Sequence, residues 1–243
     1  MNRIGRYSIG LVAGLLAHPT VAGTITGIVK FSGEKPERKP IAEIAANSFC
    51  KEACAGKNVL TDRFVFGKSG SDETLANVLV YVSKGLEGKK FEAPKEPVVI
   101  DQVHCIYTPH VVAVMVGQPL EIHNSDATLH NVMAQPKNNK AFNDGMPGTG
   151  RTLQKIFEKP ELGVSLRCFM HPWMLGHVHV LDHPFYSITA ADGSFEIKGL
   201  PPGEYEVSVF HEYSRFAPET RSLPITVTDA EPSKVGFVYG LRK

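Results

Sequence analysis

Short β-strand patterns separated by turn residues recur along most of this chain, and they constrain its fold more than any other feature. Residues 24–31 are β-branched and alternate, and the Ser-Gly-Glu-Lys-Pro run over 32–36 ends this strand. Further strand runs are predicted at 78–82, 98–100, 111–116, 120–123, 164–168 and 178–181. Strands at such short spacing are typical of a sandwich or barrel. Only residues 41–54 have a weak helical spacing, so we expect an all-β protein with one short helix there.

The C-terminal part has a distinct turn pattern. Residues 188–197 predict a hairpin of two strands joined at Asp192-Gly193. A rigid Gly-Leu-Pro-Pro-Gly turn follows at 199–203, and residues 205–210 alternate as the next strand. This region resembles the carboxypeptidase regulatory-like domains, which implies a small transthyretin-like β-sandwich.

The first two strands expected of such a sandwich lie far upstream of the Asp-Gly turn, at 25–29 and 77–82. We therefore expect an independent domain over 97–183, inserted into a discontinuous sandwich made of 23–96 and 184–243. Insertion at an exposed loop is tolerated, because doubling a loop's length adds only about 0.6 kcal/mol of closure free energy.

A cluster of metal-binding residue types lies inside this insert. Cys168-x-x-His171-x-x-Met174 combines a thiol, an imidazole and a thioether, and His130 lies upstream, after a strand, a glycine turn and a second strand. The pattern resembles the cupredoxins, the blue copper proteins, and its short ligand loop is similar to that of amicyanin. The resemblance implies a Greek-key β-sandwich in which His130, Cys168 and His171 are equatorial ligands and Met174 is axial.

The chemistry of these donors favours copper. Two imidazoles and one thiolate with a weak thioether are the ligands of electron-transfer copper, and one such cage serves both Cu(I) and Cu(II). Zinc could occupy the same donors, but structural zinc sites prefer paired Cys or His ligands. We therefore expect one copper ion. By the same resemblance, Asn131 is expected to tie the two ligand loops together by hydrogen bonds.

An apolar rim beside the second histidine is a candidate docking surface. Pro172 and Trp173, with Met146 and Pro147 on a neighbouring loop, could surround the edge of His171 and receive a redox partner. The alternative is that Trp173 fills the core of the sandwich, and the sequence favours neither interpretation.

Four cysteines are present, at 50, 54, 105 and 168. If Cys168 binds metal, one disulfide and one free thiol remain. A Cys50–Cys105 pair is preferred, and Cys50 with Cys54 is the local alternative.

The remaining histidines suggest little by themselves. His177 and His179 share one face of a strand and could bind a second copper, but we expect that face to be a solvated surface without a ligand. A further metal site formed by His104, Cys105 and His110 is also less favoured than ordinary structural roles. No partner can be identified from the sequence for three others, namely His123, His183 and His211.

The N-terminus predicts export. A basic start, an apolar run over 9–17 and small residues at 21–23 resemble a secretory signal peptide, here placed at 1–22, which implies a periplasmic or secreted protein. No stretch reaches the roughly 20 apolar residues that a membrane helix needs, so an integral membrane protein is not expected; an uncleaved anchor at the N-terminus is the alternative to export. Twenty-six Lys and Arg against 25 Asp and Glu give no basic patch for nucleic acid.

Three functional hypotheses follow. The first is an exported mononuclear type 1 copper protein that carries single electrons between redox proteins. The second is a copper-binding or copper-delivery protein, and the third is a non-redox structural or carbohydrate-associated surface module. Hydrolase, phosphate-loop, zinc-protease and dinucleotide motifs are missing, so no enzyme is expected.

Overall fold

The computed structural model describes residues 22–54 and 57–242. The signal peptide predicted at 1–22 lies, apart from residue 22, outside these residues. Within the described ranges, no helix is both long enough and apolar enough to cross a bilayer.

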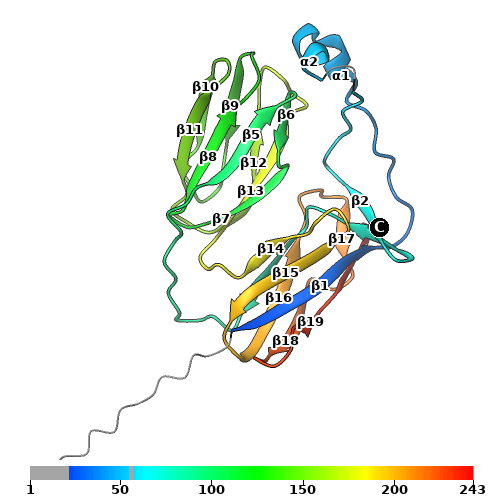
Figure 1. The fold of residues 1–243 in the computed structure, drawn as a ribbon, viewed down its shortest axis with the longest axis vertical. Coiled ribbons are helices and arrows are strands. Elements are labelled where there is room, and N and C mark those ends of the chain that lie inside the picture. Colours follow the sequence, from blue (N-terminus) through cyan, green and yellow to red (C-terminus); the bar gives the residue numbers. More distant parts are fainter. Residues whose placement is uncertain (1–21, 55–56, 243) are drawn as a thin grey trace, which may run out of the picture.

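The predicted all-β class is confirmed: the described residues form twenty strands and two short helices (Figure 1). One group of strands is contiguous in the chain: β5 (Val98–Val103), β6 (Ile106–Thr108), β7 (Val111–Met115), β8 (Pro119–Asn124), β9 (His130–Ala134), β10 (Phe142–Met146), β11 (Arg151–Ile156), β12 (Glu161–Arg167) and β13 (Leu175–Leu181). The second group comes from both ends: β1 (Gly23–Phe31), β2 (Phe66–Ser69), β3 (Asp72–Leu75), β4 (Leu79–Lys84), β14 (Tyr186–Ile188), β15 (Ser194–Leu200), β16 (Gly203–Phe210), β17 (Phe216–Pro218), β18 (Ser222–Val227), β19 (Ser233–Lys234) and β20 (Phe237–Leu241).

Strands β5 to β13 pair only among themselves and form two sheets. One sheet has the order β10-β9-β12-β13-β7, in which β13 and β7 are parallel, and the other has the order β11-β8-β5-β6. Their inner faces alternate apolar residues that are completely buried, such as Leu120 and Ile122 on β8 and Val132 on β9. We call this unit the upper sandwich, after its place in Figure 1.

The remaining strands form the lower sandwich. One sheet has the order β17-β20-β1-β3-β2, with β15 and β19 also paired to β1, and the other has the order β14-β4-β16-β18. Its separate core contains Ile25 and Val29 of β1 and Val207 of β16. Each sandwich therefore buries an apolar core of its own.

The segment expected to hold one short helix contains two, α1 (Ala42–Ala46) and α2 (Ser48–Ala53). They are separated at Asn47, whose extended backbone ends α1 and whose side chain accepts a hydrogen bond from the backbone N–H of Cys50 at 2.9 Å. Ile44 and Cys50 join the core of the upper sandwich. A disulfide joins Cys50 to Cys105, at the turn between β5 and β6.

The hairpin predicted around Asp192-Gly193 is wrong in its pairing. The turn forms, but the strands on either side enter different sheets, because β14 pairs with β4 whereas β15 pairs with β1. The reason is the turn geometry: Gly193 has a φ of +76° while Asp192 does not take a positive φ, so the two-residue hairpin turn with two positive φ angles is not made. A side chain at Gly193 would also meet the carbonyl oxygen of Val29 at 2.6 Å.

Candidate metal centre

Three side chains named from the sequence converge at one end of the upper sandwich. His130 is the first residue of β9, Cys168 directly follows β12, and His171 lies in the loop that leads to β13. The Sγ atom of Cys168 lies 3.9 Å from His130 Nδ1 and 3.7 Å from His171 Nδ1. The two Nδ1 atoms are 2.8 Å apart. All three side chains are at most 3% exposed.

This donor set fits a metal ion. The point equidistant from the three donor atoms lies ~2 Å from each, close to metal–nitrogen and metal–sulfur bonds of about 2.0–2.3 Å. Two imidazole nitrogens and one thiolate form the equatorial set of electron-transfer copper. The residues present could therefore hold a copper ion without rebuilding the fold.

Asp126 holds His130 from the far side of its ring. The Nε2 atom of His130 lies 3.0 Å from Asp126 Oδ2. An ionised carboxylate can only accept, so Nε2 carries a proton, and Nδ1 is the ring nitrogen that binds a metal once it has released its own proton. The same carboxylate accepts the backbone N–H groups of His104 and Cys105, each at 2.8 Å. Sequence reasoning did not find this role, because the two backbone partners of Asp126 lie 22 and 21 residues upstream.

Asn131 connects the two ligand loops. Its backbone N–H donates to the Sγ of Cys168 at 3.4 Å, and its side-chain oxygen accepts the backbone N–H of Phe169 at 2.6 Å. Its amide group also donates to Asn143 on β10 at 2.8 Å. These bonds restrict movement of the thiol relative to His130.

Electrostatics prepare the thiol for metal binding. Burial alone would raise the pKa of Cys168, but its hydrogen bond with His130, two backbone N–H groups and the charge on that imidazole lower it overall. Burial likewise opposes a charge on His130, yet hydrogen bonds with Asp126 and Cys168 raise its pKa. Both shifts favour the thiolate, which is the metal-binding form of cysteine.

His171 is prepared differently. Burial, followed by the positive charge of His130, lowers the pKa of His171 to about 4, so its imidazole is neutral near pH 7. The Trp173 ring packs against it with ring centres 5.1 Å apart, and the indole N–H donates to the Cys105 carbonyl at 3.0 Å. A sulfur of Cys50 and a sulfur of Cys105 both lie within 4.8 Å of a His171 ring nitrogen. The disulfide and Trp173 therefore cover this ligand.

The other residues named from the sequence lie around the centre. Met174 is 1% exposed and belongs to the same core, and its backbone N–H donates to the His171 carbonyl. Trp173 is half-buried and packs on this core, while Pro172 is exposed. The interpretation of Met146 as a rim residue on a loop is wrong, because Met146 is the last residue of β10 and its side chain is completely buried. Two large apolar side chains that follow Cys168, Phe169 and Met170, are exposed, and the sequence reasoning missed them.

His177 and His179 do not lie on a solvated surface as expected. They are 6% and 0% exposed, because the lower sandwich covers the face of β13 on which both histidines lie. The ring of His179 packs on Phe210 of β16.

The other histidines have ordinary partners. His211 lies beside Glu212, His123 pairs with Glu121 at 3.2 Å, and His183 accepts a backbone N–H from Phe185. His104, Cys105 and His110 do not form one cluster.

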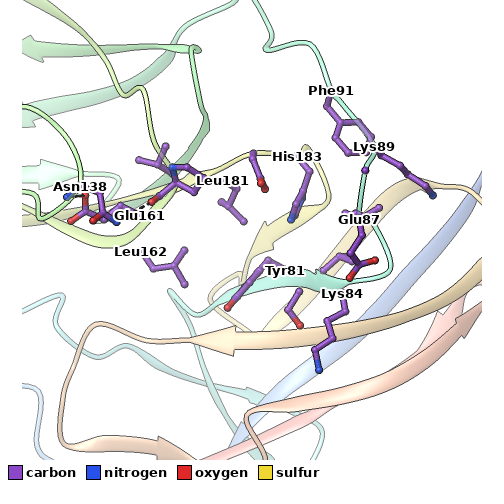
Figure 2. Close-up of a pocket in the computed structure, with 17 residues that line it drawn as sticks. Tyr81, Lys84, Glu87, Lys89, Phe91, Asn138, Glu161, Leu162, Leu181 and His183 are labelled. Carbon is purple, nitrogen blue, oxygen red and sulfur yellow. Dashed lines mark hydrogen bonds between the residues drawn. The ribbon is translucent and has the colours of Figure 1, made fainter.

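A cleft of about 580 Å³ lies between the sandwiches, away from the centre. Figure 2 shows Tyr81 and Lys84 of β4 on one side and Leu162 and Leu181 of the upper sandwich on another. In the part of the chain that the structure describes, none of the convergent groups of His, Cys, Asp and Glu includes a residue from its lining. The cleft thus offers no comparable metal-binding chemistry.

No family model and no curated protein matches this chain. Among solved structures, a copper-containing nitrite reductase (NirK) from Thermus scotoductus SA-01 is similar, with 24% identity, a TM-score of 0.34 and coverage of 40% of this chain. The chain spans only 24% of that enzyme.

Two smaller proteins are similar over most of their own length. A novel purple cupredoxin from Nitrosopumilus maritimus has 29% identity and a TM-score of 0.27, with 31% of this chain and 81% of that chain covered. A reduced mutant of amicyanin has 24% identity and a TM-score of 0.33, with 37% and 86% covered. Because these TM-scores lie below 0.5, the case for copper rests on the donor atoms themselves.

Proposed function

We propose that this protein binds one copper ion through His130, Cys168 and His171, with Met174 as a weak axial ligand, and carries single electrons between redox proteins. The observation that supports this most is the convergence of two imidazole Nδ1 atoms and one sulfur within 3.9 Å of one another, in a buried site. Bound there, copper would supply a one-electron Cu(II)/Cu(I) couple.

The surrounding residues favour electron transfer over copper delivery. Asp126 and Asn131 hold His130 and Cys168 by hydrogen bonds that need not change between oxidation states. Burial of all three ligands also hinders the ligand exchange by which a delivery protein releases its ion. A rigid, enclosed set of ligands therefore supports a carrier.

The test is metal analysis of the purified full chain with optical, paramagnetic resonance and voltammetric measurements. We expect one copper per chain, an intense thiolate-to-Cu(II) absorption and a reversible one-electron wave. A colourless, readily exchanged Cu(I) form would instead indicate copper delivery. Failure to retain copper would indicate a structural or surface-binding module.

The exposed side chains beside Cys168 are proposed to form the docking surface, together with Pro172. Phe169 and Met170 are 61% and 54% exposed and directly follow the thiolate ligand. Apolar contact there would bring a partner close to the centre while the small area allows rapid release.

Electron self-exchange between oxidised and reduced copies of this chain measures such docking without a known partner. Changing both Phe169 and Met170 to serine is expected to slow self-exchange about tenfold, because a lost apolar contact of roughly 1.4 kcal/mol corresponds to that factor, while the copper spectrum stays unchanged. Ile156→Ser is the control, since Ile156 is 56% exposed on β11. An equal effect of the control would contradict the docking role.

We further propose that the upper sandwich, taken as 97–183, is inserted into a regulatory-like sandwich made of 23–96 and 184–243. The separate sheets and cores support this organisation. Helices α1 and α2 depart from those boundaries, because their buried side chains join the core of the insert. The Cys50–Cys105 disulfide supports the proposed export to an oxidising compartment.

A further inference from the structure

A second cluster of metal-binding side chains lies where the two sandwiches meet. His110 precedes β7 and His177 lies on β13, both in the upper sandwich, whereas Glu212 follows β16 of the lower sandwich. One ligand atom from each of these residues lies within 4.8 Å of the other two. His110 Nε2 is 3.0 Å from Glu212 Oε1, and the side chains of this pair are only 5% and 4% exposed.

The cluster has polar atoms without partners. Neither ring nitrogen of His177 makes a hydrogen bond, although both are buried, and Oε2 of Glu212 is buried without one as well. An unpaired buried polar group costs about 1–3 kcal/mol. The arrangement therefore leaves buried, unpaired ligand atoms that a cation would satisfy.

The charge states also suit a cation. Burial would raise the pKa of Glu212, but the hydrogen bond from His110 and the charges of neighbouring imidazoles lower it to about 2. Burial lowers the pKa of His177 to about 4. Near pH 7 the glutamate is ionised and His177 is neutral, the forms in which both bind metal.

Two neighbouring histidines are excluded as ligands by their hydrogen bonds. His179 Nδ1 accepts the backbone N–H of Gly163 at 3.1 Å, and His211 Nδ1 accepts that of Tyr213 at 3.0 Å. A neutral imidazole that accepts at Nδ1 carries its proton on Nε2. Their Nε2 atoms therefore have no lone pair for an ion.

We propose that His110, His177 and Glu212 form a second metal site, which takes a divalent transition-metal ion of the Zn²⁺ type and links the two sandwiches. Two imidazoles and one carboxylate suit such an ion, whereas Mg²⁺ and Ca²⁺ prefer oxygen ligands and Cu(I) prefers sulfur. Ligand atoms on tetrahedral zinc lie ~3.3 Å apart, given bonds of about 2.0–2.1 Å, so binding needs only small side-chain rotations, with release of the proton that His110 Nε2 donates to Glu212. Three protein ligands leave a position for water.

The site adjoins the surface. His110 lines a cleft of about 300 Å³ that also contains Asp62 and Asn77. One of the three ligands therefore borders this cleft. Because the ligands come from both sandwiches, binding is expected to stabilise their junction.

The test uses the full chain with Cys168→Ala and His171→Ala, which removes the first centre, so that this proposal can fail independently of the copper proposal. After dialysis against a chelator, calorimetric titration with Zn²⁺ is expected to show one equivalent bound and a raised melting temperature. Co²⁺ is expected to give the visible bands of a tetrahedral nitrogen- and oxygen-ligated site. Absence of saturable binding of either ion would overturn the proposal.

Ligand assignment is tested in the same background. Glu212→Gln nearly preserves shape and is expected to weaken Zn²⁺ binding at least tenfold, and His177→Gln is expected to do the same. Glu121→Gln, in the surface pair with His123, is the matched control and should leave binding unchanged. Circular dichroism verifies folding. Unchanged affinity in either folded ligand variant contradicts the assignment. If neither variant folds, one equivalent of Zn²⁺ bound by the background protein supports the second site, and no bound Zn²⁺ overturns it.

Discussion

Replacing Cys168 with serine is expected to abolish the thiolate-to-copper absorption while the fold remains intact. Cys168 is the one thiol whose Sγ lies within 3.9 Å of both His130 Nδ1 and His171 Nδ1 in the described part of the chain. A serine hydroxyl occupies nearly the same space, but it is neither ionised near pH 7 nor a soft ligand. Optical and paramagnetic resonance spectra of copper-loaded protein measure the change.

The chain supplies a matched control for this substitution. Cys54 is the other free cysteine and is also buried, but its thiol contacts the backbone carbonyl of His104 instead of an imidazole nitrogen. Cys54→Ser should therefore retain the absorption at full intensity. Loss of the band in Cys54→Ser, or its persistence in Cys168→Ser, would exclude the proposed ligand set.

Asp126→Ala is expected to lower both stability and copper affinity. The carboxylate accepts three hydrogen bonds at 2.8–3.0 Å, from His130 and from the backbone of His104 and Cys105. Hydrogen bonds to a charged group contribute about 1.5–3 kcal/mol each and are not additive, so we expect a loss of about 4 kcal/mol in the free energy of unfolding. His130 would also lose the group that fixes its tautomer, which predicts a 10–100-fold weaker affinity.

Urea unfolding of the metal-free protein and competitive copper titration measure these two effects separately. Asp101→Ala is the control, because Asp101 accepts hydrogen bonds from the neighbouring loop residue Ser125 at the surface and contacts no ligand. It should change stability by less than about 1 kcal/mol. If Asp126→Ala behaves like this control, the carboxylate does not position His130.

Asp126 also shows why part of the centre escapes sequence reasoning. His104 and Cys105 both take left-handed backbone conformations, with φ near +57° and +56°. Their N–H groups therefore converge on a single carboxylate that lies in another loop. Such convergence depends on how β5, β6 and β8 pair, and no local pattern around residue 126 encodes it.

Part of the strand pattern was predictable, because an alternation of apolar and polar residues follows from the geometry of a strand, but no run was predicted for β9 to β11 or for β17 to β20. The runs at 98–100, 111–116 and 120–123 correspond to β5, β7 and β8. Their pairing was less predictable. The strands flanking Asp192-Gly193 lie in different sheets: β14 pairs with β4 and β15 pairs along β1, and the turn between them lacks the two positive φ angles of a two-residue hairpin.

By itself the sequence determined the strand pattern and the close spacing of Cys168, His171 and Met174, because both are properties of neighbouring residues. Tertiary structure decided what covers each face. Alternation separated His177 and His179 from Val178 and Val180, but only the packing of the lower sandwich on β13 buries the two histidines, and only that packing brings Glu212 to His110. Burial and long-range juxtaposition depend on which surfaces meet in space, and the spacing of residues along one strand does not contain that information.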